Sequence, residues 1–249
     1  MKEKLRKLLL VICICVFAYS AFQLGSIFYN YYKIEKDSEE LIDEYVMSSS
    51  DADKNAKEED PLKRVVDFKK LKERNSDVIG WLYIPDTTID EPILKGKTND
   101  TYLYSDIDKK SKTAGQVFID EINSKDFKDD NTIIYGHNMR NGSRFHNLRY
   151  YVEKEFYDGH NLVYIYLPDG SINVYKVFSA RVIDASSDFY RRDIDYKKYI
   201  EKAQSKARQK SDVSDEQNPL ILLSTCYGRD SDSRYVVFAR LDKNVKISE

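Results

Sequence analysis

The chain has 249 residues, of which 33% are charged and 41% are hydrophobic, and 40 lysines and arginines stand against 42 aspartates and glutamates. This composition is typical of a folded protein, and the net charge of −2 excludes a strongly basic nucleic-acid-binding protein. Nine glycines and five prolines exclude a collagenous or low-complexity chain. Three cysteines, two of them in one apolar run, exclude a disulfide scaffold and a four-cysteine zinc module.

The amino-terminal residues predict a membrane anchor. Four basic residues within positions 1–7 precede a segment from Leu8 to Tyr32 that carries no charge. As a helix rising about 1.5 Å per residue, this segment exceeds the roughly 30 Å of a bilayer core. The basic flank predicts a cytoplasmic amino terminus and an exported remainder. A cleaved signal peptide is the alternative, since residues 18–20 weakly fit a small-x-small cleavage site, but the apolar run continues beyond them.

The segment after the anchor predicts a stalk and a linker. Residues 31–47 carry apolar side chains at helical spacing, and residues 48–60 contain no aromatic or large aliphatic residue. Asp60 and Pro61 then predict an N-cap and a first helical position, with the helix running to about Arg74. We therefore divide the chain into a cytoplasmic basic tail (1–7), a transmembrane anchor (8–29), a helical stalk and linker (30–60) and one exported domain (61–249).

From residue 77 onward the pattern becomes that of β-strands. Strands are predicted at 78–85, 88–94, 115–120, 131–136, 162–167, 172–184, 220–226 and 235–241. Residues 168–171 (Pro-Asp-Gly-Ser) predict a hairpin turn, and the connection from 184 to 219 predicts an amphipathic helix capped by Asp193 or Asp195. Eight short strands predict a mainly β fold, a closed or nearly closed barrel, because closure removes exposed edges.

One cysteine is a candidate nucleophile. Cys226 is the only cysteine beyond the predicted anchor, so it has no intramolecular disulfide partner there, and an unpaired exported thiol favours a chemical use over simple burial. Cys226 ends one predicted strand and Arg234 opens the next, so antiparallel pairing would place both at one rim. The guanidinium there would favour the thiolate and hydrogen-bond a developing oxyanion. The alternative for Arg234 is a surface salt bridge with Asp230 or Asp232.

Thiol catalysis also needs a proton carrier, and the chain has three histidines. His137 follows the apolar strand 131–136, which suits a side chain that points at a rim site. His146 and His160 lie in polar segments that are typical of solvated surface histidines. His137 is therefore the candidate general acid and base.

These motifs together resemble the sortases, the membrane-anchored cysteine transpeptidases of Gram-positive bacteria. Residues 222–226 (L-L-S-T-C) meet the family signature T-L-x-T-C except at Leu222, which we expect to be tolerated as an internal side chain. Arg234 and the segment 136–138 (G-H-N) complete the match, which covers about residues 60–243. The resemblance is greatest to class B. It implies a mainly β fold, an eight-stranded sortase-type barrel with amino-terminal helices and a helix in the long connection before the cysteine strand.

The resemblance also implies roles for single residues. Cys226 would be the nucleophile, His137 the general acid and base, and Arg234 the residue that positions the substrate or the oxyanion. The matching substrate-binding positions are Asn99, Leu103, Tyr135, Ser224 and Thr225. By analogy, the Cys226 thiolate attacks a backbone carbonyl in a carboxy-terminal sorting motif, and an amine resolves the thioester.

The partners implied are surface proteins or pilins that carry such a motif, and an amine from a peptidoglycan precursor or a pilin. The implied location is the cell membrane, with a single pass and an extracellular catalytic domain in residues 61–249. No nucleic acid is expected. No metal or cofactor is expected either, because Asp126, Asp129 and Asp130 cluster without EF-hand spacing and no C-x-x-C or H-x-x-x-H occurs.

Two alternatives have different chemistry. A secreted cysteine peptidase of another family is disfavoured because papain-like enzymes place cysteine before histidine and the caspase Q-A-C-x-G motif is absent. A membrane-tethered adhesion or scaffold domain with an incidental cysteine is the non-enzymatic alternative. An incidental Cys226 should be buried and react slowly with alkylating agents.

Overall fold

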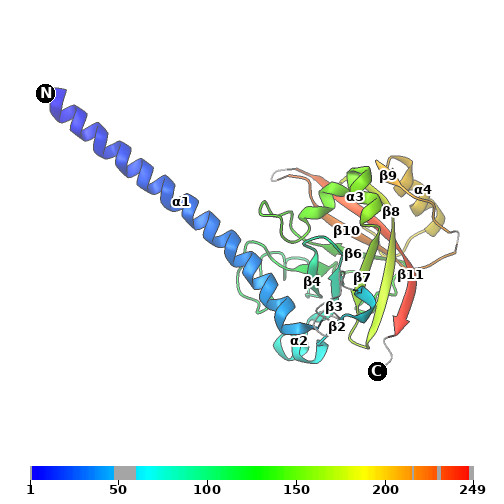
Figure 1. The fold of residues 1–249 in the computed structure, drawn as a ribbon. Coiled ribbons are helices and arrows are strands. Elements are labelled where there is room, and N and C mark those ends of the chain that lie inside the picture. Colours follow the sequence, from blue (N-terminus) through cyan, green and yellow to red (C-terminus); the bar gives the residue numbers. More distant parts are fainter. Residues whose placement is uncertain (1, 48–59, 215, 229–230, 247–249) are drawn as a thin grey trace. The chain divides into compact units, whose positions relative to one another are not determined.

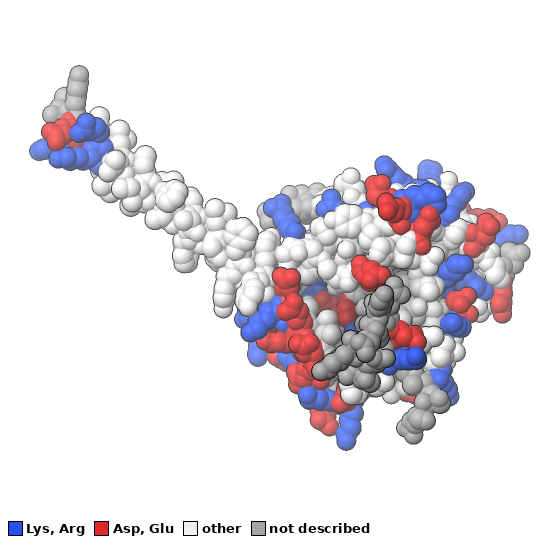
Figure 2. Space-filling view, in the orientation of Figure 1, with Lys and Arg blue, Asp and Glu red and all other residues white. Residues whose placement is uncertain are grey.

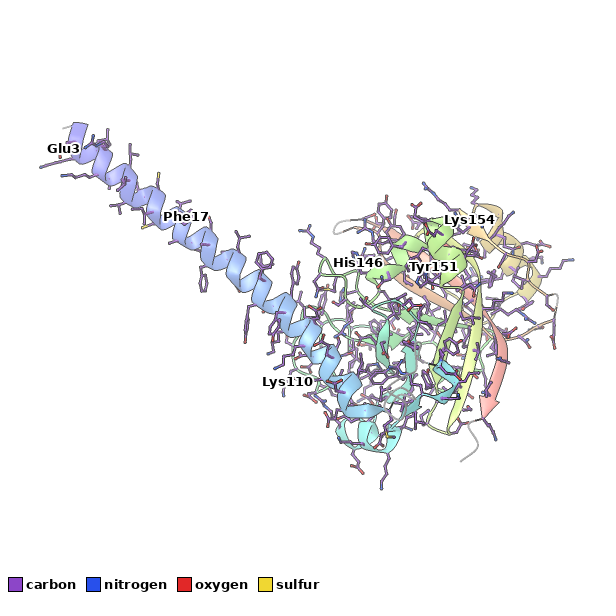
Figure 3. All side chains as sticks on the ribbon, in the orientation of Figure 1. Glu3, Phe17, Lys110, His146, Tyr151 and Lys154 are labelled. Atoms are coloured by element: carbon purple, nitrogen blue, oxygen red, sulfur yellow. The ribbon has the colours of Figure 1, made fainter. Side chains whose placement is uncertain are left out.

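A computed structural model describes residues 2–47, 60–214, 216–228 and 231–246. The chain divides into two compact units, residues 1–40 and 41–249. Helix α1 (Lys2–Tyr45) spans the first unit and ends within the second, and it contains the predicted anchor and the first part of the predicted stalk as one continuous helix (Figure 1). By length and composition this helix is able to cross a membrane, and none of its most apolar stretch is buried. Figure 2 shows a cluster of charged residues at its amino-terminal end followed by an uncharged stretch, and Figure 3 shows side chains, Phe17 among them, projecting from that stretch.

The second unit begins with short elements and the first strands of a barrel. In chain order these are β1 (Val46–Met47), η2 (Pro61–Lys63), β2 (Val65–Val66), α2 (Phe68–Arg74), β3 (Val78–Tyr83), β4 (Asp90–Leu94), β5 (Val117–Ile119) and β6 (Asn131–Tyr135). The remainder of the chain forms η3 (His146–Val152), α3 (Lys154–Gly159), β7 (Leu162–Tyr166), β8 (Ser171–Asp184), α4 (Tyr196–Ser205), β9 (Gln209–Lys210), β10 (Leu220–Cys226) and β11 (Ser233–Lys246).

Eight of the strands close into a barrel, as predicted. The sheet order is β11-β10-β6-β5-β4-β3-β7-β8-β9, and β11 also pairs with β8 to close the circle (Figure 1). Two neighbouring pairs, β4 with β5 and β6 with β10, are parallel. The barrel interior is filled by apolar side chains that alternate along the strands, including Leu82, Val117, Ile134, Leu223 and Val237.

A second apolar cluster lies where α4 covers the outer face of the barrel. Tyr199 and Ala203 of α4 pack in one cluster with Phe238 of β11. Asp195, rather than Asp193, caps this helix by accepting from the Lys198 amide. Leu222, the departure from the family signature, belongs to the same cluster and is fully buried, so its side chain is internal as expected.

The helix predicted from Pro61 to Arg74 is wrong as a single element. Asp60 does cap a helical turn, because its carboxylate accepts from the Leu62 amide, but that turn ends at Lys63. The chain is then extended, since Val66 pairs with Val46 of β1, and α2 starts anew with Asp67 as its cap. Tertiary pairing overrides the local helical pattern here. Most of the predicted linker, residues 48–59, lies outside the described residues.

Candidate active site

The parallel pairing of β6 with β10 builds the site. Since parallel strands end at the same edge, His137, just after β6, and Cys226, the last residue of β10, come to one rim of the barrel. Arg234 of β11 pairs directly with Cys226 across the antiparallel ladder. A pocket of about 190 Å³ opens there, and it contains all eight predicted catalytic and substrate-binding residues. Its lining is Asn99, Leu103, Phe118, Tyr135, Gly136, His137, Ser224, Thr225, Cys226 and Arg234.

Side-chain hydrogen bonds join the two strand ends. Thr225 Oγ1 donates to the carbonyl oxygen of Gly136 at 2.6 Å. Asn138 Nδ2 donates to the carbonyl oxygen of Cys226 at 2.9 Å. Each bond links a residue beside the histidine to a residue at the cysteine, so the backbones that carry the two reactive groups are held together.

His137 is half-buried and already has a partner. Its Nε2 atom lies 2.6 Å from the carbonyl oxygen of Leu103. A carbonyl only accepts, so Nε2 carries the proton and Nδ1 is left to take or give one. Burial lowers the pKa of His137 below its ordinary value and the positive charge of Arg144 lowers it further, whereas the Leu103 carbonyl opposes both. The imidazole is therefore neutral at pH 7.

A buried ion pair supports the loop that follows His137. Arg144, which is 1% exposed, pairs with Glu91 of β4 and also donates to the carbonyl oxygen of Gly115 at 3.0 Å. The next amide, that of Phe145, donates to the His137 carbonyl at 2.9 Å. Gly136 is required here, since a Cβ atom at this position would lie 2.7 Å from the Phe145 ring. The loop thus presses closely against the end of β6.

The Arg234 side chain is half-buried, and hydrogen bonds to the backbone hold it in place. Its Nη1 atom donates to the carbonyl oxygens of Ser231 and Ser233 at 2.8 and 2.9 Å. Within the described ranges Arg234 forms no ion pair, so the predicted alternative, a salt bridge with Asp232, is not seen. Asp230 lies outside the described residues.

Cys226 is a half-buried free thiol. The full burial that was expected of an incidental cysteine is therefore not seen.

Two residues beside the pocket escaped the sequence analysis. Tyr190 hydrogen-bonds through its hydroxyl to Ser224 Oγ at 2.9 Å, and its ring stacks on Tyr135 with centroids 6.1 Å apart. Asp120 accepts from the Tyr135 hydroxyl at 2.7 Å. No local signal marks either residue, since Tyr190 is one of 20 tyrosines and Asp120 merely follows a short strand.

The other two histidines lie outside the pocket. His146 Nε2 is 3.2 Å from the Tyr150 hydroxyl, on η3 (Figure 3), and His160 stacks on Phe156 at 3.9 Å. Both are half-buried rather than fully solvated.

In the acidic cluster that was considered as a metal site, Asp129 accepts hydrogen bonds from Asn123 and from the Ser124 amide, so its carboxylate is used by the fold. Among the described residues no group of three or more potential ligands is arranged to hold a metal.

Comparison with known proteins agrees with this geometry. The family model described as Sortase domain matches residues 82–242 of this chain. Sortase B of Listeria monocytogenes is 33% identical over 236 residues, which cover 90% of this chain and 91% of that protein. Sortase B of Staphylococcus aureus is 30% identical over 183 residues, or 71% of this chain and 75% of that protein.

Solved structures show the same similarity. Sortase B of Clostridium perfringens superposes with a TM-score of 0.65 at 30% identity, over 70% of this chain and 99% of that one. The Staphylococcus aureus sortase B–substrate complex superposes with a TM-score of 0.68 at 26% identity, over 90% of this chain and 98% of that one.

Proposed function

The chain belongs to the sortase family as a class B cysteine transpeptidase, and we propose that it joins surface proteins or pilins to an amine acceptor through a thioester on Cys226. The observation that carries this proposal is the meeting of Cys226, Arg234 and His137 in one pocket, with the first two directly paired. The other five predicted binding residues line the same pocket. The sorting peptide would lie along them.

The proposed reaction has two acyl transfers. His137 Nδ1 takes the proton of the Cys226 thiol, and the thiolate attacks a backbone carbonyl carbon of the sorting motif. Arg234, held by two backbone carbonyls, stabilises the oxyanion. Collapse breaks the peptide bond while His137 returns its proton to the leaving amine. An acceptor amine then attacks the thioester, gives its surplus proton to His137 and releases the thiolate, and His137 returns that proton to Cys226.

The remainder of the chain would hold this site outside the cell. We propose that residues 1–7 are a cytoplasmic tail, 8–29 a single-pass anchor, 30–60 a stalk and linker, and 61–249 the extracellular catalytic domain. The charge-free apolar stretch of α1 and its basic flank support this topology. Protease treatment of intact cells, which should degrade epitopes in 61–249 but not a tag at the amino terminus, tests it. A protected carboxy-terminal epitope would contradict the proposed orientation.

A peptide assay tests the chemistry. Full-length protein in detergent is mixed with quenched fluorescent peptides of different sorting motifs, with and without hydroxylamine as the amine. We expect cleavage within one motif and a hydroxamate product, both lost in Cys226→Ala, His137→Ala and Arg234→Ala. His146→Ala is the matched control, because His146 lies outside the pocket, and it should cleave normally. Cleavage that survives Cys226→Ala would exclude the thioester mechanism.

A further inference from the structure

One buried carboxylate joins two residues of the proposed peptide groove. Asp120, which directly follows β5, is 6% exposed, and its Oδ2 atom accepts from the Tyr135 hydroxyl at 2.7 Å and from Asn99 Nδ2 at 3.2 Å. Asn99 and Tyr135 lie in the pocket lining, whereas Asp120 does not. We infer that Asp120 is a positioning residue that fixes both side chains for peptide binding; this inference rests on the proposed function of the pocket.

The Asn99 amide is fixed from both of its ends. Its Oδ1 atom accepts from the backbone amide of Glu121 at 2.8 Å, while Nδ2 donates to Asp120. A backbone N–H only donates and a carboxylate only accepts, so the amide has a single allowed orientation. What Asn99 has left for a ligand is the second N–H of Nδ2 and one lone pair of Oδ1. Because the orientation of the amide is fixed, its remaining donor and its remaining acceptor each have one direction in which to meet a peptide.

Tyr135 is fixed in the same way. Its phenol donates to Asp120, and its ring lies between Phe118, at 5.5 Å between centroids, and Tyr190, at 6.1 Å. Burial raises the pKa of Tyr135, and the negative charge of Asp120 raises it further, so the phenol keeps its proton and remains a donor to the carboxylate. Tyr135 therefore contributes an aromatic side chain in one fixed orientation to the pocket lining.

Asp120 also holds the loop that carries Asn99. Its backbone carbonyl accepts from Lys95 Nζ at 2.6 Å, at the start of that loop. Its Oδ1 atom accepts from the Ile122 amide at 3.0 Å, so three donors converge on the carboxylate. An Asn side chain has one acceptor oxygen and an NH₂ group that faces donors unfavourably. Asp120→Asn therefore keeps the shape of the side chain but cannot satisfy all three donors.

The test compares Asp120→Asn with Asp129→Asn in the full-length protein. Asp129 is the control, because its carboxylate accepts two hydrogen bonds, from Asn123 Nδ2 and the Ser124 amide, but none from Asn99 or Tyr135, and it does not line the pocket. Peptide cleavage gives KM and kcat separately, and hydrogen–deuterium exchange reports the mobility of residues 95–103. We expect Asp120→Asn to raise KM roughly tenfold, to change kcat by less than about threefold and to speed exchange in 95–103. Asp129→Asn should change none of these.

Three results would overturn the inference. They are an unchanged KM with unchanged exchange in Asp120→Asn, a fall in kcat alone, and equal effects in Asp129→Asn. If thermal melting shows that Asp120→Asn does not fold, Tyr135→Phe replaces it. That substitution removes one donor to the Asp120 carboxylate, and the other donors keep their acceptor. That variant should raise KM severalfold, and an unchanged KM would then count against the inference.

Failure of the proposed function gives a different result. If the wild-type protein cleaves no peptide while the exchange of residues 95–103 still depends on Asp120, the pocket is not the peptide site but Asp120 holds the loop. If the wild-type protein cleaves and exchange is indifferent to Asp120, the function stands and the positioning role fails.

Discussion

The Nε2 atom of His137 donates to the carbonyl oxygen of Leu103 over 2.6 Å. This single bond connects the candidate acid and base to the loop that also carries Asn99, so the same loop supports the candidate base and one wall of the proposed peptide groove. It also leaves only Nδ1 for proton exchange, and it acts on an imidazole whose pKa is already lowered by burial. The ring is thus held in one orientation by Leu103 and is neutral at pH 7.

The lowered pKa of His137 predicts a pH dependence of stability. The ordinary value is 6.5, and between it and the lower folded value the unfolded chain binds more protons on this ring than the folded protein. The free energy of unfolding therefore falls as the pH drops below about 6.5 and through the folded pKa. Chemical denaturation between about pH 8 and pH 5 should show this fall, with a shallower slope in His137→Gln. Equal slopes would mean that the ring titrates alike in both states.

The Glu91–Arg144 pair predicts strong coupling between two charges. Both side chains are 1% exposed, so Glu91→Gln leaves the Arg144 charge buried without its counter-charge, and we expect a loss of about 3–5 kcal/mol in urea unfolding. The double variant Glu91→Leu/Arg144→Met should lose less than Glu91→Gln alone.

The matched control for this pair is an exposed one. Lys154 of α3 (Figure 3) pairs with Asp158 at the surface, and Lys154→Ala should cost less than about 1 kcal/mol. Similar costs for the buried and the exposed pair would contradict the argument from burial.

The hydrogen bond of the Thr225 hydroxyl predicts that the alignment of β6 and β10 affects kcat. Thr225→Val keeps the size of the side chain but removes the donor to the Gly136 carbonyl, so the ends of β6 and β10 lose one connection. We expect about 1 kcal/mol less stability and a kcat roughly tenfold lower. Thr225→Ser restores the hydroxyl and should retain most of both. A Val variant with normal kcat would show that the bond does not align the reactive groups.

Replacing Arg234 by lysine tests whether the rate depends on the guanidinium group or only on its positive charge. Arg234→Lys keeps the charge, but its single nitrogen must replace both Nη1, which binds two backbone carbonyls, and the Nε and Nη2 donors that would face the oxyanion. We expect kcat to fall about 100-fold with a smaller change in KM. The rate of Cys226 alkylation by iodoacetamide serves as the control for an intact thiol site. A Lys variant with normal kcat would reduce the role of Arg234 to charge alone.

Much of this protein follows from local patterns in the chain. Short runs rich in aliphatic, β-branched and aromatic residues, bounded by turn residues, predicted all eight barrel strands. Arg234 follows Cys226 by eight positions, so a short loop between consecutive strands was enough to predict their pairing. The family signature then singled out the residues that line the pocket.

Contacts between distant segments were decided only in the folded barrel. Residues 131–135 and 220–226 share no local signal, yet their parallel pairing carries His137 to Cys226. The same holds for Asp120 beneath Asn99 and Tyr135, for Tyr190 against Ser224, and for the extended segment at Val66 that interrupts a predicted helix. Periodicity reports which face of an element is buried, but the partner of that face is chosen by the closure and packing of the whole barrel.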